Sequence, residues 1–77
     1  MDGVGIAAMK KLRETFELFA AKGAESHETL QHVWTELVPH LSREERRALN
    51  IARSRAVFLK DRIEFDRVCD TIRRRLF

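Results

Sequence analysis

Three histidines and one cysteine are the residues of this 77-residue chain that could hold a metal ion or act as a nucleophile. His27 and His32 are five residues apart, which places them on different sides of a helix, and His40 follows a proline. Structural zinc sites pair Cys or His residues at short, regular spacings, and no such pair occurs here. We therefore predict neither a metal site nor a bound cofactor.

Catalytic groups are equally hard to find in the sequence. Cys69 falls on the apolar stripe of the last predicted helix, where no helix start or glycine-rich turn would activate its thiol. The carboxylates of Glu44, Glu45, Asp66 and Asp70 lie among arginines on polar faces, which favours surface ion pairs over acid–base catalysis. A phosphate-binding loop is also missing. The sequence predicts a protein that is not an enzyme.

Composition indicates one small helical domain. The chain is 44% hydrophobic and 35% charged, which is too apolar for intrinsic disorder. It has one proline, three glycines, no tyrosine and no alternating run of β-branched residues, so helices are favoured over strands. We predict an all-α fold that forms a single domain over residues 1–77.

The sequence also bears on location. No apolar stretch approaches the roughly 20 residues that span a bilayer. The N-terminus has an acid before its short apolar run and lysines after it, the wrong order for a secretory signal. A single cysteine fits a reducing compartment. We expect an intracellular protein, cytoplasmic or cytoskeletal, with no membrane span.

Apolar residues spaced by three and four predict four amphipathic helices. Their approximate bounds are residues 5–21, 27–38, 43–54 and 61–76. Gly23 is expected to end the first helix and Pro39 the second. Ser42, with Glu45 three residues later, predicts a capping box that starts the third. The consecutive apolar residues 57–59 break the helical period, and we expect them to form a short extended piece packed on the core.

This order of segments resembles a lobe of two EF-hands from the calmodulin, centrin and myosin light chain superfamily. The resemblance covers roughly residues 9–72 and rests on four segments, FELF, TLQHVWTELV, SREERRAL and IEFDRVCDTI. It implies an orthogonal four-helix domain built from two EF-hand-like helix–loop–helix units.

The calcium loops of that family are degenerate in this chain. A calcium loop has twelve residues, with oxygen ligands at alternate positions and a glutamate at the twelfth. The first loop, AAKGAESHET, has ten residues and begins with two alanines and a lysine. If Glu64 is the twelfth residue of the second loop, Arg53 and Arg55 occupy its first and third positions. We therefore expect no calcium binding.

The resemblance then implies a calcium-independent adaptor. Such a lobe binds an amphipathic helix or an assembly partner through an apolar groove. The groove residues would be Phe19, Val33, Trp34, Leu37 and Val38. Packing inside the domain is the alternative role for each, and Trp34 is the one best suited to an interface. Self-association is also open, because the stripe of the first helix continues outward to Ile6 and Met9.

Nucleic-acid binding is the alternative function. Residues 43–77 carry eleven Lys and Arg against six Asp and Glu. The arginines that would form a polyanion-binding face are Arg43, Arg46, Arg47, Arg73, Arg74 and Arg75. Acids are interspersed among them and the aromatic residues fall on apolar stripes, which disfavours base stacking. The sequence therefore favours a protein partner over nucleic acid.

Overall fold

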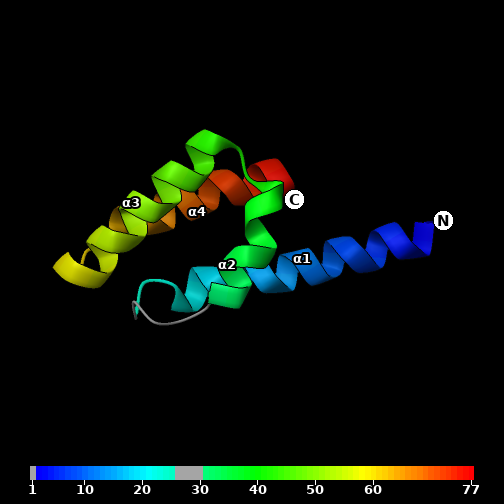
Figure 1. Ribbon diagram of the computed structural model, residues 1–77, viewed down its shortest axis with the longest axis horizontal. Coiled ribbons are helices and arrows are strands. Elements are labelled where there is room, and N and C mark those ends of the chain that lie inside the picture. Colours follow the sequence, from blue (N-terminus) through cyan, green and yellow to red (C-terminus); the bar gives the residue numbers. More distant parts are fainter. Residues whose placement is uncertain (1, 26–30) are drawn as a thin grey trace.

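Helices account for most of the computed structural model, which describes residues 2–25 and 31–77 (Figure 1). The elements are α1 (Asp2–Lys22), α2 (Gln31–Leu37), the 3-10 helix η1 (Val38–His40), α3 (Arg43–Leu59) and α4 (Ile63–Leu76). The described residues include no strand, so the all-α prediction is confirmed. The predicted start of the second helix, with His27, lies outside the described residues.

The helices form two pairs that meet near the middle of an elongated molecule. α2 packs against α1, and α3 lies antiparallel to α4 (Figure 1). The molecule measures 45 × 22 × 18 Å, and the N-terminal half of α1 extends away from the other helices. The turn between α3 and α4 lies at the opposite extremity.

Three phenylalanines form the centre of the core at the junction of the two pairs. Phe16, Phe19 and Phe65 are at most 1% exposed, and the rings of Phe19 and Phe65 lie 5.9 Å apart. Full burial of such a ring contributes roughly 1.5–3 kcal/mol. The other large side chains that are almost fully buried are Leu37, Leu49 and Ile72. The core therefore joins α1 to α4, in addition to the packing of α1 on α2 and of α3 on α4.

The predicted capping box starts α3. The Glu45 backbone N–H donates to Ser42 Oγ at 3.1 Å, and the Ser42 N–H donates to Glu45 Oε1 at 2.8 Å. These bonds satisfy backbone donors that a helix start leaves without partners. Leu41, directly before the cap, is buried and fixes the entry of α3 to the core.

The prediction of an extended piece at residues 57–59 is wrong. α3 continues to Leu59 and ends at Lys60, whose backbone is left-handed at φ 59° and ψ 30°. Phe58 and Leu59 are 64% and 67% exposed, because this end of α3 passes beyond the core. Residues 53–59 contain neither Gly nor Pro, so nothing in them stops a helix that has already started.

The longer α3 leaves a short connection to α4. Only residues 60–62 join the two helices, compared with the twelve residues of a calcium loop. Arg53 and Arg55, which the family resemblance placed in the second loop, are helical.

Gly23 ends the first helix, as predicted, but its role is close packing. Its N–H donates to the Phe19 carbonyl at 2.7 Å, and its φ is not positive. A Cβ atom at this position would lie 2.6 Å from that carbonyl oxygen and 3.2 Å from Phe65 Cζ. The first distance is shorter than real Cβ atoms show, and the second is tighter than nine in ten of them. A side chain at this position would therefore strain the end of α1 and crowd Phe65 of α4.

Gly23→Ala should therefore destabilise the fold. We expect the free energy of unfolding in urea to fall by about 1–3 kcal/mol, the usual effect of overpacking. Gly5→Ala is the matched control, because a Cβ there meets nothing within 4 Å and alanine favours the helix. If both variants were as stable as the natural chain, the packing role of Gly23 would be refuted.

Candidate functional site

The described residues offer no cluster for a metal ion. No group of three or more His, Cys, Asp or Glu side chains comes together in residues 2–25 and 31–77. His32 and His40 are exposed on separate elements, α2 and η1.

Cys69 is enclosed in the core. Its side chain is 2% exposed, and burial raises the pKa of its thiol to about 12. Arg73 partly opposes this shift by favouring the thiolate, but desolvation is the larger effect. The position therefore suits a small buried apolar residue rather than a nucleophile.

One bidentate ion pair connects α1 to α4. Arg73 Nε donates to Glu17 Oε2 at 2.7 Å, and Arg73 Nη2 donates to Glu17 Oε1 at 2.9 Å. These bonds lower the pKa of the Glu17 carboxyl, against the opposing effect of partial desolvation. The guanidinium also contacts Asp70 and lies 5.5 Å from the centre of the Phe16 ring. Arg73 is thus held beside the aromatic core.

A second pair connects the end of α4 to the start of α3. Arg75 Nε donates to Glu45 Oε2 at 2.5 Å, and Arg75 Nη2 donates to the His40 carbonyl at 2.8 Å. The bond to Arg75 is the largest cause of the lowered pKa of Glu45, and bonds from Ser42 add to it. Glu45 therefore caps α3 and anchors the C-terminus of α4 at once.

The predicted polyanion face is divided by these contacts. Arg73 and Arg75 are committed to carboxylates. Arg46 is partly buried, and its Nε has no hydrogen-bond partner among the described residues. The other three predicted arginines, Arg43, Arg47 and Arg74, are exposed and form no ion pair with any described residue.

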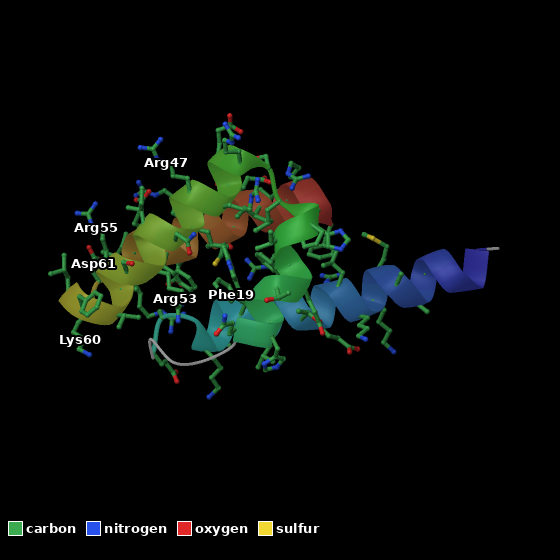
Figure 2. The ribbon with its side chains drawn as sticks, viewed as in Figure 1. Phe19, Arg47, Arg53, Arg55, Lys60 and Asp61 are labelled. Carbon is green, nitrogen blue, oxygen red and sulfur yellow. The ribbon has the colours of Figure 1, made fainter. Side chains whose placement is uncertain are left out.

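The outer side of α3 carries the exposed cations. Arg43, Arg47 and Arg55 are exposed and separated by multiples of four residues, which places them on one side of the helix. Figure 2 shows Arg47 and Arg55 pointing away from the other helices, whereas Arg53 points toward α1 and donates to the Gly23 carbonyl at 2.7 Å. Arg55, expected just after the end of the third helix, is thus part of this helical face.

The predicted groove residues come together, but inside the protein. Phe19, Val33 and Leu37 are 1%, 2% and 0% exposed. Trp34 and Val38 are partly buried, and the Trp34 ring lies 5.6 Å from that of Phe19. In this arrangement the five side chains belong to the core and its edge, and a partner would reach most of them only if the helices separated.

Two other apolar surfaces are open to solvent. The first, which we call the α1 stripe, consists of Ile6 and Met9, 68% and 46% exposed. The second, the hairpin tip, consists of Phe58, Leu59 and Ile63, 64–71% exposed at the turn between α3 and α4. The apolar run at residues 57–59 is the sequence signal of this tip, although such a run also suits a buried segment.

Comparisons with known protein families, with curated proteins and with solved structures find no match for this chain. Within the described residues, no helix is long and apolar enough to cross a membrane. The features that bear on function are therefore the exposed surfaces and their chemistry.

Acid should weaken the fold through Glu17 and Glu45. Their folded-state pKa values lie below the usual 4.5, so their contribution is present above that pH and is lost as the pH falls through the lowered values. We expect the free energy of unfolding to decrease below about pH 5. Urea denaturation at a series of pH values measures this dependence.

Glu17→Gln should flatten that acid dependence. It should lower the free energy of unfolding at neutral pH by no more than about 1 kcal/mol, because the pair with Arg73 is partly exposed. Glu14→Gln is the control, since Glu14 is exposed and forms no ion pair with a described residue. An identical acid dependence in both variants would contradict the assignment.

The Cys69 thiol should resist modification in the folded protein. Because it is buried and its pKa is raised to about 12, we expect reaction with a disulfide reagent at mildly alkaline pH to proceed no faster than unfolding. The reaction followed by absorbance should become rapid in denaturing urea. Rapid labelling without urea would show that the thiol is accessible.

Proposed function

We propose that this chain is a calcium-independent, non-catalytic module that binds a protein partner through the α1 stripe. The supporting observation is that the core-facing stripe of α1 continues past the end of the core. Leu12 is 9% exposed, Met9 46% and Ile6 68%, at spacings of three that keep them on one side of the helix. The outer part of an apolar stripe is thus available to another protein.

The surroundings of the stripe support a helical or assembly partner. Where α1 leaves the body, the Arg13 guanidinium lies 5.7 Å from the centre of the Phe77 ring, and Phe77 is 37% exposed. A shallow cavity of about 320 Å³ between α1 and η1 is lined by Ala8, Leu12 and His40, among others. A partner helix laid along α1 would meet apolar side chains at its centre and polar groups at its edge, the usual composition of an interface.

This location differs from the groove expected from the sequence. Docking on Phe19 or Leu37 would require displacing core packing, whereas Ile6 and Met9 are reached without any opening. The orthogonal EF-hand-like arrangement stays a hypothesis, supported by the pairing of α1 with α2 and of α3 with α4 in chain order. An intracellular site of action belongs to the same proposal and agrees with the single free, buried cysteine.

Nucleic-acid binding has less support. It relied on six arginines acting together, and Arg73 and Arg75 are engaged by Glu17 and Glu45. Binding that is lost on nuclease treatment and weakens steeply with salt is the result that would replace the proposed function.

The test removes the apolar character of the stripe and leaves the core intact. Ile6→Ser with Met9→Ser should abolish retention of partner proteins in affinity capture, or turn a self-associated chain into a monomer in sedimentation. The thermal unfolding midpoint should hardly change, because both side chains are exposed.

Ile51→Ser is the matched control for that variant. Ile51 is 52% exposed on α3, away from the stripe, so its replacement should leave partner retention and sedimentation as in the natural chain. Equal loss in the control and the double variant, or no loss in either, would refute a specific role for the α1 stripe.

A further inference from the structure

The hairpin tip is an apolar prominence at one extremity of the protein. Phe58, Leu59 and Ile63 occupy the last turn of α3 and the first residue of α4, on both sides of the turn at residues 60–62. All three are more than 60% exposed, although core residues Ala56 and Phe65 lie within a few positions. Large apolar side chains gathered on a surface mark an interaction site more often than scattered ones do.

Cations stand directly beside these side chains. Arg55 is one helical turn before Leu59, and Lys60 follows it; both are exposed and neither is ion-paired with a described residue. Figure 2 shows both side chains projecting from this end of the molecule. The stretch 46–60 contains no acidic residue, whereas it contains five Lys and Arg.

The acid within the turn is engaged, and the turn is tied to the body. Asp61 is partly buried, and its Oδ1 accepts from the Ile63 N–H at 3.0 Å. Arg62 Nη2 donates to the Ala20 carbonyl of α1 at 3.0 Å and to Asp66 Oδ1 at 3.3 Å. The turn that carries the apolar residues is therefore held against α1, so its backbone needs little further ordering on binding.

We propose that the hairpin tip inserts into the surface of an anionic lipid bilayer. Phe58, Leu59 and Ile63 would enter the boundary between headgroups and acyl chains, and Arg55 and Lys60 would contact anionic headgroups. The surface of an anionic bilayer has negatively charged headgroups on the outside and an apolar phase beneath them. The tip presents apolar residues with cations beside them, so both chemistry and charge are complementary.

Lipid is favoured over nucleic acid by the apolar part of the tip. Phosphates would attract Arg55 and Lys60, but the grooves of a duplex offer no apolar phase for Leu59 and Ile63. The tip lies at the opposite extremity from the α1 stripe (Figure 1), so the inference is independent of the proposed function. The Ile6→Ser and Met9→Ser double variant should bind vesicles as the natural chain does.

Cosedimentation with vesicles tests the proposal. The natural chain should bind vesicles of phosphatidylcholine and phosphatidylserine and should bind phosphatidylcholine alone much more weakly. Leu59→Ser with Ile63→Ser should lower the partition coefficient by about tenfold or more, because apolar area is lost from the inserted end. Arg55→Gln should lower it by about fivefold on the anionic vesicles, the effect of one basic residue near such a surface.

Arg74→Gln is the matched control for charge. Arg74 is exposed, forms no ion pair with a described residue and is eleven positions from Ile63, about 16 Å along α4. Its replacement removes the same charge and should change vesicle binding by less than about twofold, because it lies beyond the Debye length at moderate salt. Circular dichroism should show unchanged folding in each variant, since all the replaced side chains are exposed.

Three results would overturn the proposal. The first is absence of binding to phosphatidylserine vesicles by the natural chain. The second is an equal loss of vesicle binding in Arg74→Gln and Arg55→Gln, together with no loss in the Leu59→Ser and Ile63→Ser double variant. That result would show that binding depends on net charge alone. The third is binding of a duplex oligonucleotide that depends on Arg55 without any vesicle binding, which would assign the cations to nucleic acid.

Discussion

Burial of Phe16, Phe19 and Phe65 at the junction of two helix pairs is the interaction on which the rest of the structure depends. A two-helix pair buries too little surface to be stable alone, and a 77-residue chain has few apolar residues for a core. Placing these rings between α1 and α4 lets both pairs share one core. Gly23 permits the close approach, and the Glu17–Arg73 pair closes the same junction at its edge.

The location of this core determines which parts of the helices remain exposed. α1 has 21 residues and α3 has 17, which correspond to lengths of about 31 and 25 Å. The core covers the middle of the molecule, so the first half of α1 and the last turn of α3 extend past it (Figure 1). The α1 stripe and the hairpin tip are therefore two consequences of one arrangement, in which the helices are longer than the core that they enclose.

Local features of the sequence were enough to predict the helices. The contacts between distant segments could not be predicted in the same way. The stripe spacing and the Ser42 capping box depend on residues within one or two turns, so they could be read directly. The end of α3 could not be predicted from local sequence, because consecutive apolar residues are buried only where a core lies beside them. Helical spacing places Arg73 nearer the apolar stripe of α4 than Arg74. Glu17 is 56 positions away from Arg73, however, and nothing local pairs the two. Contacts between distant segments therefore determine which of the predicted arginines are ion-paired and which of the predicted groove residues are buried.

The exposed apolar residues are hard to explain by folding alone. Burying a side chain such as Phe58, Leu59 or Ile63 contributes roughly 1.5–3 kcal/mol, and the whole domain is expected to be stable by only about 5–15 kcal/mol. Leaving these three side chains exposed therefore forgoes a stabilising free energy comparable to that of the whole fold. Polar residues at these positions would keep α3 and α4 helical and would reduce the risk of aggregation. An apolar surface that folding does not require is best accounted for by something that covers it, and the exposed cations Arg55 and Lys60 indicate that the covering surface is anionic.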